Sequence, residues 1–245
     1  MRQTRVFIEH PLHQGDRVVL PAGPGRHLSQ VLRLTSGEPV TLFNGDGYDY
    51  ACRLVASGRG ETTVVIEGAS GPEPVIPLEI HLALGISKGE RMDYAIQKAV
   101  ELGVGRLTPL FTERSQVRLD GPRLQRRMEH WQGILIAACE QSGRRRLPQL
   151  DTALTLEDWL DGVSGAEFLL LDPQAGSSLT QIEPPEVKIG LVVGPEGGLS
   201  PREHELARRR GCRGVRLGPR ILRTETAPLA AIAVLQALWG DFRDT

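Results

Sequence analysis

The pattern of apolar and polar residues along this chain changes once, near residue 73. Before that point, short β-branched runs alternate with turn residues, which predicts strands at 6–8, 17–20, 40–43, 50–55 and 62–67. The turn Asn44-Gly45-Asp46-Gly47 lies between the third and fourth of these runs and predicts a β-hairpin. Only 27–34, with Leu28, Val31 and Leu32 on one side, has the spacing of a short helix. The first seventy or so residues therefore predict a small β-barrel.

After residue 77, apolar runs alternate with segments of helical spacing. Strands are predicted at 78–86, 106–110, 168–171, 189–193 and 215–217, and helices at 91–102, 124–139, 201–210 and 226–239. Strands that alternate with helices predict a parallel α/β sheet. The segment 71–77 carries three prolines in seven residues, so it fits neither a helix nor a central strand and is interpreted as a stiff linker. We therefore predict two domains, residues 1–73 and residues 74–245.

Composition narrows the class of protein. With 40% hydrophobic and 24% charged residues, the composition is that of a globular protein and not of a disordered one. We expect no membrane span, because no apolar run approaches the roughly 18 residues required. The first residues lead into a predicted strand without the apolar segment of a signal peptide. The three cysteines are scattered, so we expect no disulfide, no metal and a reducing, cytoplasmic location.

The distribution of arginine, rather than the net charge of −1, points to nucleic acid. Residues 208–223 contain seven arginines and no acid, and smaller clusters lie at 123–127 and 144–146. A GC-rich genome can account for the high share of arginine, but it does not account for the clustering. Guanidinium groups suit phosphate binding and stacking on bases.

Two turns in the last fifth of the chain each follow a predicted strand. The first runs Gly194-Pro195-Glu196-Gly197-Gly198-Leu199-Ser200, and the second runs from Leu217 to Ala227 and contains Arg-Thr-Glu-Thr. Adjacent strand ends that open into such turns form the ligand crevice of an open α/β sheet. Gly197 and Gly198 allow the backbone to approach a ligand closely. Ser200 is predicted to cap the helix that follows, because Glu203 lies three residues later.

These two turns resemble the signature of the SPOUT (trefoil-knot) RNA methyltransferases, and within that family the ribosomal RNA small-subunit methyltransferase E branch. The resemblance continues through 88–104, 112–115 and 138–144, and reaches the first domain at 27–33 and 44–47. It implies an N-terminal PUA-like RNA-binding β-barrel and a C-terminal α/β-knot methyltransferase domain. It also implies S-adenosylmethionine as the cofactor and N3-methylation of a uridine in 16S ribosomal RNA.

The implied reaction suggests roles for three charged residues. Uracil N3 becomes a good nucleophile only after its weakly acidic proton leaves, and the methyl donor is already activated, so no metal is required. Arg223 is the candidate for stabilising the charge that develops on the uracil oxygens. Glu225 is a candidate base or orienter of that arginine, with Glu196 as the alternative carboxylate. Glu225 can equally be an acid at a helix N-terminus, and Thr224 the N-cap of the same helix.

The resemblance also implies two sets of binding residues. The cofactor is expected to contact Leu171, Gly194, Pro195, Glu196, Gly197, Gly198, Leu217, Gly218, Ile221, Leu222, Arg223, Thr226 and Ala227. The apolar members of this set can equally be core residues. Candidate RNA contacts are Arg2, Arg5, His27, Arg33, Arg114 and Arg144. The other histidines, His204 among them, show no ligand spacing and are interpreted as structural or surface residues.

The last predicted helix bears on assembly. From Ala227 to Trp239 its only polar residue is Gln236, so it must be buried on more than one side. We expect a homodimer built around it, although burial within one chain is the alternative. The expected partner is 16S ribosomal RNA, free or in the assembled small subunit. Two other functions remain open: another SPOUT activity, such as 2′-O-ribose or guanine-N1 methylation of tRNA, and RNA binding without catalysis.

Overall fold

The computed structural model describes residues 4–56, 61–117, 119–183 and 188–243, and the chain divides into two compact units. The first unit contains residues 1–74 together with 139–147, and the second contains 75–138 and 148–245. The sequence did not predict that 139–147 pack with the first unit. Each unit is described separately below.

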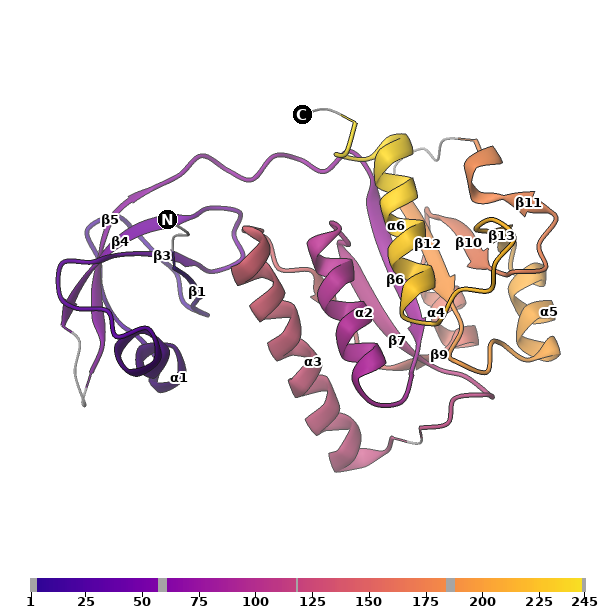
Figure 1. Ribbon diagram of the computed structural model, residues 1–245, viewed down its shortest axis with the longest axis horizontal. Helices are drawn as coiled ribbons and strands as arrows, with labels where there is room; N and C mark the ends of the chain where they lie inside the picture. Colours follow the sequence, from indigo (N-terminus) through magenta and orange to yellow (C-terminus); the bar gives the residue numbers. More distant parts are fainter. Residues whose placement is uncertain (1–3, 57–60, 118, 184–187, 244–245) are drawn as a thin grey trace. The chain divides into compact units, whose positions relative to one another are not determined.

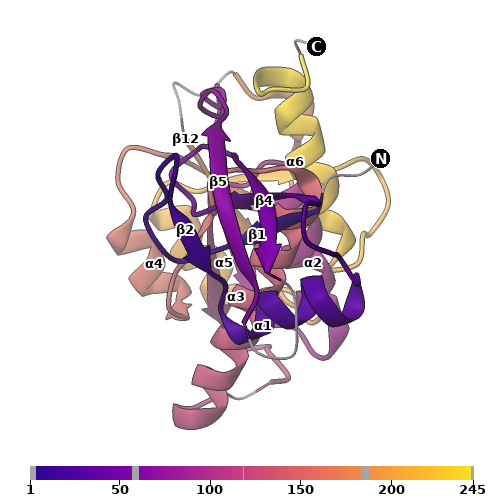
Figure 2. The same cartoon turned by 90° about the vertical axis from the view of Figure 1, so that its left-hand side faces the viewer.

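The sheet of the first unit is a five-stranded half-barrel (Figure 1, Figure 2). Its strands are β1 (Arg5–Phe7), β2 (Arg17–Val19), β3 (Pro39–Phe43), β4 (Tyr50–Ala56) and β5 (Thr63–Ala69), in the order β1-β3-β4-β5-β2. β1 pairs in parallel with β3, and the other pairs are antiparallel. The predicted hairpin joins β3 to β4. Inward-facing Tyr50, Cys52 and Leu54 alternate with outward residues along β4, which is how a sheet buries one face.

The helical segment of this unit differs from the prediction. It begins at α1 (Ala22–Arg26) and continues into a π-helical turn, η1 (His27–Val31). The Leu32 N–H donates to the His27 carbonyl five residues back, and this wider turn carries Val31 and Leu32 away from the buried face that holds Leu28. Arg33 follows with φ 56° and is the only residue other than glycine with positive φ in the described part of the chain.

The second unit is built on a parallel sheet, as predicted, but the sheet has eight strands rather than the five expected. The strands are β6 (Glu79–Gly85), β7 (Arg106–Phe111), β8 (Gln149–Leu150), β9 (Leu154–Thr155), β10 (Glu167–Leu171), β11 (Ser177–Ser178), β12 (Lys188–Val193) and β13 (Arg213–Arg216). Their order is β11-β13-β10-β12-β6-β7-β8, and β9 pairs with β7. Every residue of β6 and β12 after the first is buried, as expected of strands covered on both faces.

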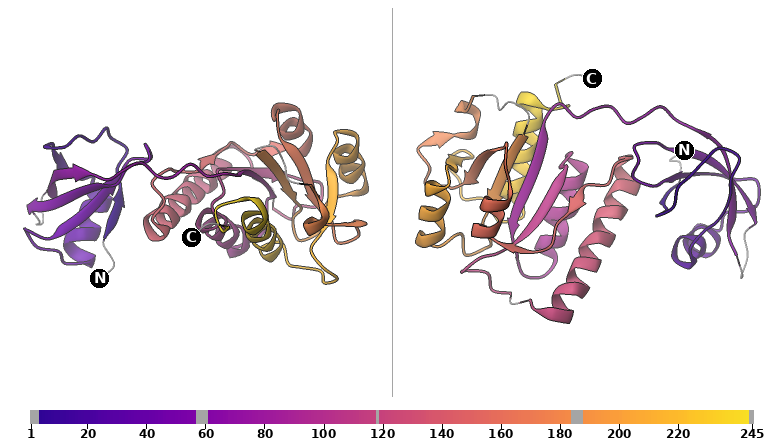
Figure 3. Two further views of the ribbon diagram at one scale, coloured as in Figure 1. Left: turned by 90° about the horizontal axis from the view of Figure 1, so that it is seen from above. Right: turned by 180° about the vertical axis from the view of Figure 1, so that it is seen from behind.

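Helices cover both faces of this sheet (Figure 3). α2 (Glu90–Glu101) packs with α6 (Thr226–Trp239) on one face, while α4 (Leu156–Gly162) packs with α5 (Pro201–Arg209) on the other. α3 (Gly121–Ser142) and the short 3-10 helix η2 (Leu179–Gln181) complete the set. The sequence analysis missed α4, although Thr155 caps it by accepting from the Asp158 N–H. No helix of the described residues is long and apolar enough to cross a membrane.

The start of α5 is fixed as predicted. Ser200 Oγ accepts from the Glu203 N–H at 3.1 Å, and Glu203 Oε2 accepts from the Ser200 N–H at 2.7 Å. Glu203 Oε1 also accepts from the Glu113 N–H at 2.9 Å. One buried carboxylate therefore holds both the helix start and the loop after β7.

Candidate active site

A cavity of about 580 Å³ lies where β13, β10 and β12 end side by side. Parallel strands place their carboxyl ends at one edge, which is where open α/β sheets bind ligands. Eleven of the thirteen predicted cofactor residues line it: Leu171, Gly194, Pro195, Glu196, Gly197, Gly198, Leu217, Ile221, Leu222, Arg223 and Ala227. Gly218 and Thr226 are not among the lining residues. The core interpretation is wrong for Ile221, which is 85% exposed.

The glycine turn at 194–198 is held by contacts with its neighbours. The Thr224 hydroxyl donates to the Gly194 carbonyl at 2.9 Å, and Arg114 Nη1 donates to the Gly197 carbonyl at 3.2 Å. A Cβ at Gly197 would lie 3.0 Å from Arg114 Cβ. A side chain at 197 would therefore press against Arg114, which would have to move by a few tenths of an ångström.

Thr224 does not cap α6, contrary to one interpretation of the sequence. The N-cap position is Glu225, whose side chain makes no capping hydrogen bond. The Thr224 hydroxyl instead donates to Gly194 and lies 3.4 Å from the Ser87 hydroxyl. Its role is to join the second turn to the first.

Glu196 lies at the wall of the cavity with its two oxygens in different surroundings. Oε1 accepts from the Lys88 N–H at 3.0 Å and from Arg91 Nη1 at 2.9 Å. Oε2 is buried and has no hydrogen-bond partner among the described residues. Burial favours a higher pKa for Glu196, but the backbone N–H groups of Glu196 and Lys88 and the Arg91 guanidinium together hold its pKa below the usual value. The carboxylate is therefore ionised at neutral pH.

Glu225 and Arg223 lie close to each other in the same cavity. Arg223 Nη1 is 4.0 Å from Glu225 Oε1, and the Arg223 side chain is 81% exposed. Glu225 Oε2 is buried without a hydrogen-bond partner in the described part of the chain. A buried oxygen without a donor has lost its hydration uncompensated, so it is suited to receive a donor from a ligand.

Several residues of the cavity wall were not predicted as site residues. Among the charged or titratable ones, Arg91, His204, Arg216 and Arg220 line the cavity. The Arg216 guanidinium is tied to the carbonyls of Ala175 and Gly176 at 2.7 Å each, so it shapes the wall. His204 lies four residues after Ser200, at the start of the helix that follows the glycine turn. This position could have been recognised from the sequence.

The predicted RNA contacts fall into different environments. His27, Arg33 and Arg114 are exposed, and Arg144 is partly buried. Arg2 lies outside the described residues. The prediction does not hold for Arg5. Its side chain is only 10% exposed, pairs with Asp49 at 2.6 Å and lies over the Phe43 ring. Because this guanidinium is engaged in contacts within the fold, Arg5 is not proposed as an RNA contact.

Replacement of Gly85 by alanine is expected to weaken cofactor binding about tenfold. A Cβ at the end of β6 would lie 2.5 Å from the Pro195 nitrogen, and the strain of such overpacking is about 1–3 kcal/mol. The first turn would have to shift to relieve it. Calorimetry with S-adenosylmethionine measures the effect, with Gly133→Ala as the control because its Cβ meets nothing within 4 Å. Equal affinity in the two variants would show that the turn can shift without cost.

A second cavity of about 430 Å³ lies near the amino ends of β6 and β7. Buried His81 lies beside it, and its Nε2 is 2.7 Å from Thr108 Oγ1 and 3.1 Å from Trp159 Nε1. Asp151 accepts from Thr108 Oγ1 and Arg106 Nε nearby. Burial, opposed in part by Asp151, lowers the pKa of His81 to about 4.

This histidine predicts a pH dependence of stability. Unfolded His81 binds a proton near pH 6.5, whereas the folded ring does so only near pH 4, so the free energy of unfolding should fall as pH drops between these values. The loss is at most about 3 kcal/mol. Urea unfolding at several pH values should show this slope in the wild type and not in His81→Gln. Asp151, with its pKa lowered by the Arg106 and Thr108 hydrogen bonds against the opposing effect of burial, acts in a lower window, below about pH 4.

Comparisons with known proteins agree with this geometry. A family model described as an RNA methyltransferase domain matches residues 74–236, and a model of an RNA methyltransferase PUA domain matches residues 25–67. The expected PUA-like unit and parallel α/β methyltransferase unit are thereby confirmed.

Similar proteins cover nearly the whole chain. The ribosomal RNA small subunit methyltransferase E of Buchnera aphidicola (subspecies Schizaphis graminum) is 31% identical over 98% of both chains. The Synechocystis protein of the same name is 35% identical over 90% of this chain and 73% of its own. The crystal structure of the Neisseria gonorrhoeae protein of that name, bound to S-adenosylmethionine, is 41% identical, with a TM-score of 0.94 over 98% of this chain and 99% of that one.

Proposed function

Because the chain belongs to the ribosomal RNA small subunit methyltransferase E family, we propose that it transfers a methyl group from S-adenosylmethionine to N3 of a uridine in 16S ribosomal RNA. The observation that carries the proposal is the cavity at the strand ends. Its wall combines a glycine turn, an exposed arginine and two carboxylates with unpartnered oxygens.

The residues of the cavity fit S-adenosylmethionine. Half-buried Leu171, Leu217 and Leu222 offer apolar contact to an adenine ring, and backbone N–H groups of the two turns can reach its polar edge. The unpartnered oxygens of Glu196 and Glu225 suit a ligand with positive charge and hydroxyl donors. When bound, S-adenosylmethionine supplies a methyl group on a positively charged sulfur.

The protein's own residues then act on the uracil. We assign Arg223 to the negative charge that develops on the uracil oxygens as N3 loses its proton, because its side chain is exposed at the cavity and only loosely paired. Glu225 Oε2 is the proposed acceptor of the N3 proton. Glu196, with its lowered pKa and two donors on Oε1, is better suited to bind the cofactor than to accept this proton.

We further propose that the two roles divide between residues 1–73, which bind RNA, and residues 74–245, which hold the cofactor and catalyse. His27 and Arg33 in the first range remain proposed RNA contacts, and Arg114 and Arg144 are proposed to add contacts from the second. The exposed or partly buried position of each side chain supports these assignments, and the match of a PUA model to 25–67 supports those of His27 and Arg33. We propose a cytoplasmic location, where this RNA is found.

The protein is proposed to act as a homodimer built around α6. Ala231, Ile232 and Leu235 are buried within one chain, and Gln236 Nε2 donates to the Leu102 carbonyl at 3.1 Å. The rest of this apolar helix is mostly half-buried, and exposed Ile221 lies just before it. Sedimentation equilibrium at micromolar concentration tests the proposal, and an active monomer would refute it together with any site completed by the partner.

Mass spectrometry of ribosomal RNA nucleosides, with and without this protein, tests the reaction. We expect N3-methyluridine to appear in small-subunit RNA only when the active protein is present. Methylation of ribose or guanine in tRNA would support another SPOUT activity, and RNA binding without any new methyl group would show a binding protein. Offering free 16S RNA and assembled subunits in parallel identifies the substrate.

A further inference from the structure

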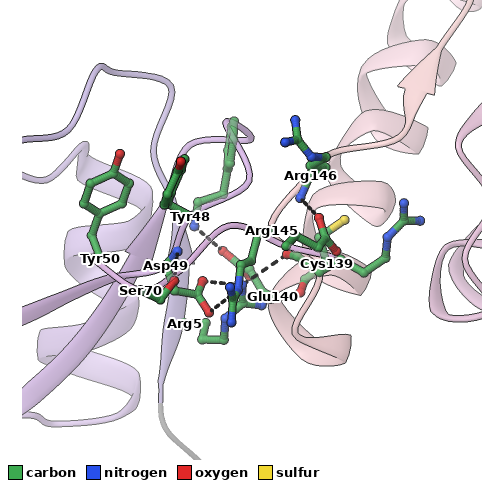
Figure 4. A network of polar contacts seen from close by, with 12 residues as sticks. Arg5, Tyr48, Asp49, Tyr50, Ser70, Cys139, Glu140, Arg145 and Arg146 are labelled. Atoms are coloured by element: carbon green, nitrogen blue, oxygen red, sulfur yellow. Dashed lines mark hydrogen bonds and ion pairs between the residues drawn. The ribbon is translucent and has the colours of Figure 1, made fainter. Parts of the chain in front are cut away.

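The turn at 44–48 and the loop at 144–147 pack against each other within the first unit (Figure 4). A Cβ at Gly47 would lie 2.8 Å from Arg146 Nη2, 2.9 Å from Cζ and 3.1 Å from Nε. Since all three guanidinium atoms are equally close, the group lies flat against the backbone of Gly47. A Cβ at Gly45 would lie 3.7 Å from Leu147 Cγ, an ordinary packing distance. The loop at 144–147 therefore packs against the two glycines of the predicted hairpin.

The main chain of the loop is fixed by hydrogen bonds. The Arg146 N–H donates to Glu73 Oε2 at 2.8 Å, and the Arg144 carbonyl accepts from Arg5 Nη2 at 3.1 Å. Arg145 contributes from its side chain, because its Nη1 donates to the Gly71 carbonyl and its Nε lies 3.3 Å from Asp49 Oδ2. Arg146 is thus presented by an ordered loop, so it loses little conformational freedom on binding a ligand.

The acids around the loop are already engaged. Asp49 pairs with Arg5 and Arg145, while Glu73 and Glu140 accept from backbone N–H groups. The Arg146 side chain is exposed and has no ion-pair partner among the residues that the structure describes. Counting Asp46, four acids lie here beside four arginines, so their charges balance and the segment creates no broad positive electrostatic field. What it presents to a ligand is the single guanidinium of Arg146.

An exposed tyrosine directly follows the glycine that Arg146 packs against. Tyr48 directly follows Gly47 and is 37% exposed, and its N–H donates to Asp46 Oδ1 at 2.9 Å. Figure 4 labels both residues, which come from the two segments that pack together. An aromatic side chain and an arginine on one surface are a combination that binds unpaired nucleotides, since the base can stack on the ring and the phosphate can pair with the guanidinium.

We propose that Arg146 and Tyr48 form a further RNA-binding surface, specific for a single-stranded segment of the substrate. Arg146 takes a phosphate and Tyr48 stacks on a base. The inference rests on the proposed function, because RNA is the partner in both. It also gives Arg5 a positioning role, since Arg5 holds the loop without touching RNA.

Fluorescence anisotropy of the full-length protein with a short labelled single-stranded RNA, and with the matching duplex, tests this surface. We expect Arg146→Ala to raise the single-strand Kd about fivefold to tenfold and to reduce the salt slope by about 0.7. Tyr48→Ala should raise the Kd about tenfold. Arg146→Lys, which keeps the charge without the planar group, should lie between. Arg53→Ala, an equal loss of charge at a side chain paired with Glu67, should change little.

Wild-type affinity and salt slope in Arg146→Ala would overturn the proposal, and so would an equal loss for duplex and single strand. If Arg146→Ala proves unstable, Arg146→Lys and Tyr48→Ala carry the test. Calorimetric binding of S-adenosylmethionine should remain unchanged in all variants. A protein that binds single strands in this way but transfers no methyl group would refute the proposed reaction and leave this surface standing.

Discussion

Arg223→Ala is expected to lower methyl transfer about a hundredfold or more while leaving the fold and most cofactor binding intact. Removal of one preorganised electrostatic stabiliser usually costs about that factor. The side chain is 81% exposed and its nearest acid is 4.0 Å away, so the fold does not depend on it. Single-turnover transfer of labelled methyl to RNA measures the chemical step directly.

Arg213→Ala is a suitable control for this variant. Arg213 begins β13, at the end of the strand remote from the cavity, and its Nη1 lies 3.9 Å from Glu167 Oε1. The same loss of charge there should change the rate by less than about twofold, as expected of a weak surface pair. Near-wild-type turnover in Arg223→Ala would remove this residue from the mechanism.

Residues 1–73 produced alone are expected not to fold cooperatively. Arg5, which is 10% exposed, would lose the Cys139 and Arg144 carbonyls, at 2.7 and 3.1 Å, and the Phe7 N–H would lose Glu140 Oε1 at 3.0 Å. Leaving such partly buried groups without their hydrogen-bond partners costs about 1–3 kcal/mol each. A domain of about 70 residues has little more stability than that. Circular dichroism during urea unfolding measures the effect.

A fragment in which a glycine-serine linker joins 1–73 to 139–147 provides the control. It restores the carbonyls and the carboxylate, so it should unfold cooperatively where 1–73 alone does not. Equal stability of the two fragments would show that residues 139–147 contact the barrel without stabilising it.

Elements with a strong local pattern could be predicted from the sequence. The parallel strands, the capped start of α5 and most of the cavity wall follow from apolar runs and turn residues. The contacts that correct the prediction join distant residues: Arg5 and Cys139 are 134 positions apart, and Thr224 and Gly194 are 30 apart. No local spacing encodes such pairs. The trefoil threading implied by the resemblance is non-local in the same way and stays a prediction.

Local sequence patterns also misled, most clearly in the helical segment of the first unit. The helix predicted at 27–34 assumed the ordinary α-helical turn, whereas η1 inserts a wider one and exposes Val31 and Leu32. The pattern of a single sequence does not distinguish an α-helical turn from a π-helical one. The extra residue changes which side chains face the core and leaves the composition unchanged.

The carboxylate of Glu203 has an evolutionary consequence. It accepts from both the Ser200 N–H and the Glu113 N–H, so the loop that ends at the start of α5 and the loop after β7 cannot change independently. Substitutions on one side will change which substitutions the other side tolerates, and their effects will not add. Lineages of this family should therefore exchange residues at the two loops in concert, and grafting only one loop from a relative should fail where grafting both succeeds.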